Sequence, residues 1–250
     1  MLSAKQKQRY LRNIIIPQIN QDGQKKLLAS NILVIGAGGL GSSAIYYLAA
    51  NGVGNITVID NDEVELSNLQ RQIIHNNSDI GEAKVYSAKK KINLLNDDVI
   101  ISPIKMRIDY EYLKKIVNNF DYILDCSDNF NTRFAINKAC YENSMNLISA
   151  AVKEFYGQLA FFNFSKKSQP CYSCFNHNDI KKDFDLPISE KGILGSIPGI
   201  LGSMQATLTI NQILNIGQDM SAKMMICDLL NFNFRQVKLN KNRSCKICSR

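Results

Sequence analysis

The chain contains 250 residues, 45% of them hydrophobic, which can bury a substantial core in one large α/β domain without a second domain. No stretch approaches membrane-spanning length, and the apolar run at 14–16 is too short for the core of a signal peptide, so a cytoplasmic protein without a membrane contact is expected. The formal net charge of +8 suits an acidic protein partner, and nucleic acid is not favoured because no interleaving of basic and aromatic residues accompanies the charge.

Residues 3–30 predict leading helical segments, and a buried parallel strand follows at 31–35. A glycine-rich run comes directly after this strand and opens onto a helical stretch at 42–51. A strand, a tight turn and a helix start in that order hold phosphate on backbone N–H groups at the helix N-terminus. The glycines of this run are Gly36, Gly38, Gly39 and Gly41.

A second predicted strand, at 55–59, ends in Asp60, where such folds place the acid that binds a ribose hydroxyl. A glycine run of this kind is by itself a weak signal. At this point NAD(H), another nucleotide and a purely structural tight turn all remain open.

Polar and charged residues crowd the segment after this strand: Asp62, Ser67, Asn68, Arg71, Gln72 and Lys84. They supply more positive charge than a diphosphate dinucleotide usually receives from side chains, which redirects the prediction to ATP. Arg71 can bind phosphate oxygens as a fork, while Lys84 acts as a point charge that stabilises departing pyrophosphate. The alternative is that both are ordinary surface cations of a basic protein.

Another apolar strand, predicted at 120–124, is followed closely by Asp128 and Asn129. Ligands of an open parallel sheet bind beyond the carboxyl ends of its strands, so Asp128 is expected to face the same crevice as the glycine run. A carboxylate there can hold Mg²⁺ against the phosphates. Alternatively, Asp128 or Asn129 caps the next helix, and the two roles are compatible.

The second half of the chain predicts strands at 146–152 and 157–164, a helix at 197–216 and two closing strands within 224–239. The polar segment 176–192 predicts a crossover loop near the site, or alternatively an unimportant surface loop. The expected fold class is α/β. It is a Rossmann-like mixed sheet with a parallel nucleotide-binding half, an antiparallel second half and helices on both faces.

Taken in chain order, these motifs resemble the ThiF/MoeB/HesA family, bacterial relatives of the ubiquitin-activating enzymes. The resemblance is carried by residues 9–12, the glycine run, Asp60, residues 67–72, Gly81 with Lys84, residues 125–129, Gly157 with Gln158, and residues 171–174, 199–206 and 245–248. It implies a single adenylation domain over 1–250, with N-terminal helices at 1–30, a nucleotide-binding half at 31–152 and a carrier-binding half at 153–250.

The resemblance implies ATP-dependent adenylation of the C-terminal glycine carboxylate of a ubiquitin-like sulfur-carrier protein ending in Gly-Gly, with release of pyrophosphate. The carrier would be of the MoaD or ThiS type, for molybdopterin or thiamine biosynthesis. Such an enzyme mainly has to align the carboxylate oxygen with the α-phosphate and offset charge.

Residue roles follow from the same resemblance. Gly39 and Asp60 bind the nucleotide, Asn68, Arg71 and Lys84 engage phosphates, and Asp128 positions Mg²⁺. The remaining residues of the expected nucleotide site are Gly36, Gly38, Gly41, Asp62, Ser67, Gln72 and Asn129. Arg12 matches a family arginine that reaches into the neighbouring subunit's active site, which implies a homodimer.

Four of the seven cysteines form two CxxC pairs, Cys171 with Cys174 and Cys245 with Cys248. Their thiolates can complete a tetrahedral Zn²⁺ site if the fold brings the pairs together, and disulfides or a redox pair are the alternatives. Family members commonly carry zinc here, so a structural Zn²⁺ is favoured. Cys126, Cys140 and Cys227 are expected to be small buried residues, and His75 and His177 to be surface or loop residues without a catalytic role.

One position departs from the family pattern. Several members have a cysteine just before a Glu-x-Gly segment that takes up the carrier or sulfur, and Ile188 occupies its place here. An alkyl group cannot replace a thiolate, so the reaction is expected to stop at the acyl-adenylate, which leans towards the molybdopterin type. A tRNA-modifying relative, an NAD-binding oxidoreductase and a non-catalytic relative are the alternative functions.

Overall fold

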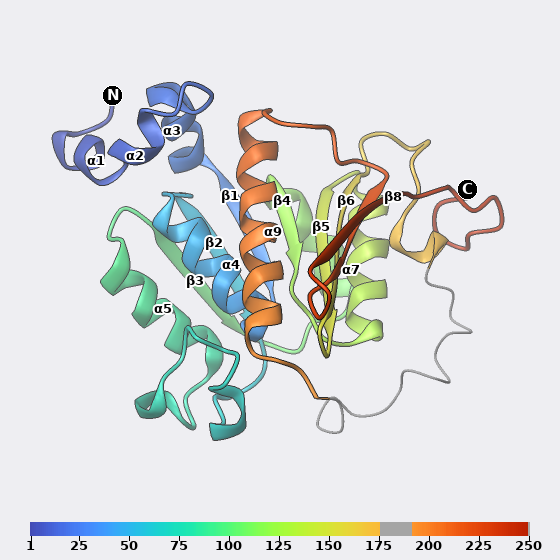
Figure 1. The fold of residues 1–250 in the computed structure, drawn as a ribbon, viewed down its shortest axis with the longest axis horizontal. Coiled ribbons are helices and arrows are strands. Elements are labelled where there is room, and N and C mark those ends of the chain that lie inside the picture. The colour runs from blue at the N-terminus through green and yellow to red at the C-terminus, as the bar shows by residue number, and fades with distance from the viewer. Residues whose placement is uncertain (176–191, 250) are drawn as a thin grey trace.

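The structure is a computed structural model that describes residues 1–175 and 192–249. Its centre is one sheet of eight strands in the order β3-β2-β1-β4-β5-β6-β7-β8 (Figure 1). The strands are β1 (Asn31–Ile35), β2 (Asn55–Asp60), β3 (Ile100–Lys105), β4 (Tyr122–Asp125), β5 (Asn146–Lys153), β6 (Tyr156–Asn163), β7 (Lys223–Asp228) and β8 (Asn233–Lys238). Strands β1 to β5 pair in parallel, and β6, β7 and β8 extend the sheet in antiparallel fashion, which confirms the predicted mixed sheet.

Helices connect the strands and cover the sheet. They are α1 (Ala4–Arg9), α2 (Leu11–Ile14), α3 (Asn20–Ala29), α4 (Gly39–Ala50), α5 (Lys84–Leu95), α6 (Tyr110–Ile116), α7 (Phe130–Glu142) and α9 (Ser196–Leu214). Short 3₁₀ turns are η1 (Leu66–Asn68), η2 (Asn77–Asp79), η3 (Val117–Asn119) and η4 (Tyr172–Cys174). Within the described residues, no helix is long and apolar enough to cross a membrane.

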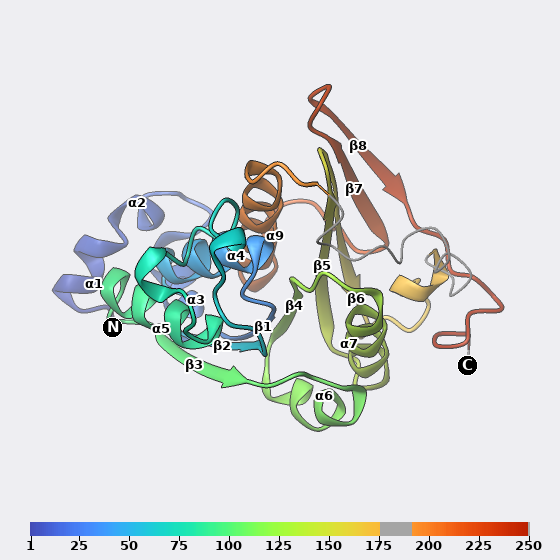
Figure 2. The same ribbon diagram turned by 90° about the horizontal axis from the view of Figure 1, so that it is seen from below.

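The alternation of side chains along β1 shows why both faces of the sheet are covered. Ile32 and Val34 are buried in a core formed with α3, α4, α5 and α9. Leu33 and Ile35, which point the other way, are buried in a second core formed with α6 and α7 (Figure 2). Because successive strand residues face opposite sides, a continuously apolar strand requires a layer on each side.

Element boundaries differ from the sequence prediction at two places near the site. The helix after the glycine run begins at Gly39, earlier than the predicted 42, because Gly38 already serves as its N-cap residue. The strand predicted from 120 begins at Tyr122, because Phe120 ends the turn η3 and its N–H donates to Val117 O. The predicted crossover loop lies, up to residue 191, outside the described residues.

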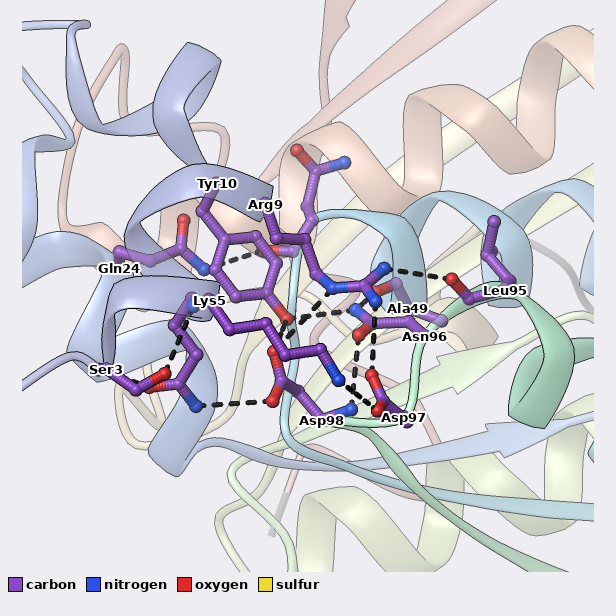
Figure 3. A network of polar contacts seen from close by, with 12 residues as sticks. Ser3, Lys5, Arg9, Tyr10, Gln24, Ala49, Leu95, Asn96, Asp97 and Asp98 are labelled. Carbon is purple, nitrogen blue, oxygen red and sulfur yellow. Dashed lines mark hydrogen bonds and ion pairs between the residues drawn. The ribbon is translucent and has the colours of Figure 1, made fainter.

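A polar network fastens the N-terminal helices to the far ends of α4 and α5 (Figure 3). Asn96, which is 1% exposed, donates from Nδ2 to Tyr10 Oη at 2.9 Å and to Ala49 O at 2.7 Å. Tyr10 Oη donates in turn to Asp98 Oδ2 at 3.1 Å, and burial raises the pKa of Tyr10 to about 12. Arg9 adds an ion pair with Asp97. These bonds fix the helix that carries Arg12.

Replacing Asn96 with Ala is expected to lower the free energy of unfolding by about 2 kcal/mol, because Ala49 O and Tyr10 Oη lose a buried partner. Urea unfolding would measure the change. Asn118→Ala is the matched control, since Asn118 is exposed and, within the described part of the chain, its amide bonds only the Asn143 side chain, so the change should cost less than about 0.5 kcal/mol. Equal losses for the two variants would contradict a special role for Asn96.

Candidate functional site

The turn between β1 and α4 can be formed only with glycine at two positions. Gly36 has a φ of +102°, and a Cβ there would lie 2.7 Å from Cys126 O. A Cβ on Gly41 would lie 2.0 Å from Gly36 O. The backbone is therefore packed too tightly for a side chain at these two positions, and the first N–H groups of α4 have no partner within the helix. This is the arrangement that binds phosphate at a helix N-terminus.

Asp60 closes this turn from the end of β2. Its Oδ2 accepts from Ala37 N at 2.7 Å, and its Oδ1 accepts from Asp62 N at 2.8 Å. Burial raises the pKa of Asp60, although the nearby Lys84 charge and these N–H groups act in the opposite direction. The carboxylate thus orders the turn and the next loop at the edge where a ribose is expected.

Lys84 and Arg71 lie beside the turn. Lys84 is the first residue of α5, is only 6% exposed, and places Nζ 2.9 Å from Asp62 Oδ2. Arg71 is half-buried, with its stem against Gly39, and its Nη1 donates to Ser67 O at 3.0 Å. A nearly buried lysine is not an ordinary surface cation, so that alternative fails for Lys84.

Two buried amides complete this side of the site. Asn68 is 7% exposed and accepts from Glu65 N, while its amide donates to Ser67 Oγ. Gln72 is 4% exposed, and its Oε1 has no hydrogen-bond partner within residues 1–175 and 192–249. An orphaned buried oxygen is costly unless a ligand or water satisfies it, and Nε2 of the same amide lies close to Gly38, so the residues present fit a polar ligand at the turn.

Asp128 and Asn129 follow β4 at the same edge of the sheet, and both are exposed. Asn129 caps α7, with its Oδ1 accepting from Thr132 N at 2.9 Å, so the capping alternative is confirmed for this residue. Among residues 1–175 and 192–249, the Asp128 carboxylate makes only a long contact of 3.4 Å with the Asn129 amide. It therefore remains available to a cation.

Arg12 does not reach this site within its own chain. The network around Asn96 holds the N-terminal helices against Ala49, near the C-terminal end of α4. The glycine turn lies at the opposite end of that helix, whose 12 residues span roughly 18 Å (Figure 1). Arg12 is exposed on α2.

The sequence prediction missed two polar residues near the site. Arg133 on α7 is buried, donates to Ala150 O at 2.7 Å and to Ser127 O, and lies 3.8 Å from Asp125. It lines a small pocket together with Ser149, Gln158, Tyr172, Phe175 and Met224. No local signal marks Arg133, because its partners come from β4 and β5.

His75 is the second missed residue. It lies in a loop, as predicted, but it is only 5% exposed and so does not lie at the surface. Both ring nitrogens have partners, Ser87 Oγ at 2.8 Å and Ala37 O at 3.0 Å. Burial lowers the pKa of His75. The signal available in the sequence was the apolar Ile73-Ile74 pair directly before it.

The four cysteines of the two CxxC pairs form a second, separate centre. All four are buried, and their sulfur atoms lie within 4.8 Å of one another. Cys171 Sγ lies 3.7 Å from Cys245 Sγ, and Cys174 Sγ lies 3.2 Å from Cys248 Sγ. These distances exceed a disulfide bond of about 2.05 Å. Cys126, Cys140 and Cys227 are buried elsewhere, as predicted.

This centre fits a tetrahedral metal ion. Four thiolates at Zn–S distances of ~2.3 Å would place their sulfur atoms about 3.8 Å apart, close to the spacing observed. A hydrogen bond from the Cys171 thiol lowers the pKa of Cys174, whereas the same pairing raises the pKa of Cys171 and burial raises that of Cys248. The donor set is therefore that of a closed structural zinc site.

The fold and the two sites define an α/β protein with a glycine turn of the nucleotide-binding kind and, separately, a four-cysteine cluster that fits a metal ion. Sequence comparison makes the assignment more specific. The ThiF family model matches residues 10–247, and the chain belongs to the ThiF family.

Curated relatives match over nearly the whole chain. The chain is 35% identical over 247 residues to the molybdopterin-synthase adenylyltransferase of Escherichia coli K12, covering 99% of this chain and 98% of that protein. It is 36% identical to the SAMP-activating enzyme E1 of Haloferax volcanii, covering 99% and 90%. It is 33% identical to the sulfur carrier protein adenylyltransferase of Thermus thermophilus, covering 96% and 90%.

Solved structures share the fold. Escherichia coli MccB in complex with ATP superposes with a TM-score of 0.82 at 24% identity, covering 96% of this chain and 73% of that one. PaaA superposes with a TM-score of 0.80 at 22% identity, covering 96% and 76%. These similarities support the Rossmann-like mixed sheet.

Proposed function

We propose that this protein catalyses the ATP-dependent adenylation of the C-terminal glycine carboxylate of a ubiquitin-like sulfur-carrier protein, with release of pyrophosphate. The observation that carries the proposal is the nearly buried Lys84 beside the glycine turn, at the carboxyl edge of the sheet that also holds Asp60 and Asp128. A buried cation at a phosphate-binding turn serves a highly charged ligand. The names of the relatives at 33–36% identity support the same reaction.

In this proposal the chain's residues divide the work by their positions. The turn N–H groups and Arg71 hold the phosphates, and Asp60 binds the ribose. Asp128 positions Mg²⁺, whose charge would offset that of the phosphates. Lys84 exchanges its contact with Asp62 for the departing pyrophosphate. Together, these contacts would align an oxygen of the carrier's C-terminal carboxylate with the α-phosphate of ATP.

The carrier's terminal residues are proposed to bind beside Arg133, where the described residues leave a small pocket with room for about one water molecule. It lies on the α7 face of β5 and β6, and Arg133 donates to Ser127 O, the residue directly before Asp128. A carrier C-terminus bound there would point towards Asp128, at the carboxyl edge of the sheet. The narrow lining suits glycine, which has no side chain to accommodate.

The reaction product and the type of carrier are inferred from the sequence. Ile188, which lies outside the described residues, offers no nucleophile, so the product is the acyl-adenylate. We assign the carrier to the molybdopterin type, in keeping with the names of two of the curated relatives.

The four-cysteine centre, in this proposal, holds structural Zn²⁺.

Exchange of radiolabelled pyrophosphate into ATP tests the proposal. The purified protein is incubated with each sulfur carrier from its own genome, either intact or lacking the terminal glycine. Exchange that requires the intact terminus is the expected result, and the carrier that supports it identifies the pathway. Absence of exchange with every intact carrier would overturn the proposal.

Arg12 is proposed to act in the site of a partner subunit, which requires a homodimer. Arg12→Ala and Lys84→Met variants should each have little exchange activity. Co-expressed, they should regain about one quarter of the wild-type rate, because half of randomly formed dimers are mixed and each mixed dimer has one complete site.

Lys84→Met co-expressed with Arg71→Met is the matched control. If Arg12 alone acts across the interface, each mixed dimer of these two variants lacks a complete site. This mixture should then recover less exchange activity than the mixture of Arg12→Ala and Lys84→Met. No recovery in the Arg12→Ala mixture would contradict action in trans. Sedimentation velocity would check that dimers form.

A further inference from the structure

The buried histidine of the nucleotide-binding half has no part in the function proposed above. His75 follows Gln72 in the chain, and its N–H donates to Gln72 O at 3.0 Å. Its ring is enclosed between the glycine turn and α5, with a contact to each through a different nitrogen. A buried imidazole with two directed contacts is a candidate for an orienting role.

The chemistry of the two partners fixes the tautomer. A carbonyl oxygen can only accept, so the nitrogen near Ala37 O, Nε2, must carry the proton. Nδ1 of the neutral ring is then an acceptor and lies 2.8 Å from the Ser87 hydroxyl, for whose single proton the Asp79 carboxylate competes. Burial favours the neutral ring by lowering the pKa of His75.

The contact with Ala37 acts on the phosphate turn itself. Ala37 is held through its N–H by Asp60 and through its C=O by His75, so two successive peptide planes are fixed. A trans peptide points its C=O and N–H in opposite directions. Holding the Ala37 carbonyl towards His75 therefore directs the Gly38 N–H away from the ring. Within the described ranges, that N–H has no hydrogen-bond partner.

The contact with Ser87 ties the turn to the helix that carries the phosphate-binding lysine. Ser87 lies three residues after Lys84 on α5, so the two are neighbours on the helix surface. His75 thus links the glycine turn to α5, the helix that carries Lys84. Such a bridge sets the relative position of two phosphate-binding elements before the ligand arrives.

We propose that His75 is a positioning residue that orients the phosphate-binding turn through Ala37 O and links this turn to α5 through Ser87. The inference rests on the proposed function, since it assumes that the turn binds the phosphates of ATP. His75 touches no phosphate itself. Its substitution should therefore weaken binding of ATP and leave binding of adenosine, which has no phosphate, unchanged.

Two conservative variants separate the two contacts. The amide of Asn reaches about as far as Nδ1, and the longer Gln carries its NH₂ to about the place of Nε2. His75→Asn should bind Mg·ATP about tenfold more weakly, as expected for one lost hydrogen bond at the turn. His75→Gln should stay within about threefold of wild type because it can still donate to Ala37 O. Calorimetric titration with Mg·ATP and with adenosine measures both ligands.

Thr209→Val is the matched control. It removes a fully buried hydroxyl on α9 that donates to Gln205 O at 2.7 Å, and it should destabilise the fold without changing ATP affinity. Thermal unfolding confirms that each variant is folded. ¹⁵N spectra of the imidazole in the wild-type protein should show the Nε2–H tautomer.

The outcomes are distinct. If wild type does not bind ATP, the proposed function fails. If wild type binds ATP and His75→Asn binds it equally well, or loses adenosine in the same proportion, the inference alone is overturned. Should His75→Asn not fold, Ser87→Ala decides: about threefold weaker ATP binding supports the inference, and unchanged binding overturns it.

Discussion

Replacing Lys84 with Met is expected to lower the rate of ATP–pyrophosphate exchange by about 10²–10³, because a preorganised charge near the leaving group is lost. Lys84 is 6% exposed, so water cannot replace its ammonium group in the site. Met keeps most of the volume of the side chain and leaves the first turn of α5 packed. Asp62, which loses its partner, is exposed enough to be solvated, and the fold should persist.

Lys90→Met is the matched control for this prediction. Lys90 lies on the same helix and pairs with Glu82 at 2.6 Å, but its side chain is 62% exposed and points to solvent. Its substitution should leave the exchange rate unchanged. An unaltered rate in Lys84→Met would remove Lys84 from the mechanism, and an equal loss in Lys90→Met would indicate a general effect of net charge.

Replacing Cys171 or Cys245 with Ser is expected to reduce the bound zinc and to destabilise the protein. The two residues come from separate pairs, so each substitution opens the four-sulfur centre from a different side. Zinc contributes ~10–16 kcal/mol to the folding of small zinc domains, and here a loss of about 3 kcal/mol is expected because the sheet keeps its own core. That corresponds to roughly 6–12 °C in Tm at this chain length.

Cys140→Ala is the control that separates the effect of losing the metal from the effect of losing a buried sulfur atom. Cys140 is fully buried in the same apolar cluster but is not one of the four clustered cysteines. Its substitution should keep the full zinc content and cost only about 1 kcal/mol. Atomic absorption and thermal unfolding measure the two quantities. Full zinc content in both Ser variants would refute the metal site.

Local sequence features predicted most of the fold. Continuously apolar runs such as 31–35 and 55–59 predicted the buried parallel strands, because strands covered on both faces need apolar residues in succession. Asp60 and Asp128 were predicted to face one crevice because parallel strands place their carboxyl ends at one edge of the sheet. The four cysteines required an additional assumption, namely that the fold joins two pairs that are 74 residues apart, and the structure confirms it.

The roles of His75 and Arg133 could not be predicted in this way. His75 contacts Ala37, which is 38 residues away, and Arg133 contacts Ala150 across two elements. Neither contact leaves a periodicity or spacing in the sequence. The buried state of Lys84 was missed for the same reason, and it changes the interpretation of that residue from an optional surface charge to a fixed part of the site.

The sequence by itself determined the glycine turn, the acid at the end of β2 and the two CxxC pairs, because their chemistry depends on residues that are close in the chain. Only the tertiary structure decided which polar side chains are buried and what they contact. Burial depends on packing between elements distant in sequence, and it is burial that makes a hydrogen bond or a charge strong. The same packing places Arg12 at the far end of α4, where its own site is out of reach.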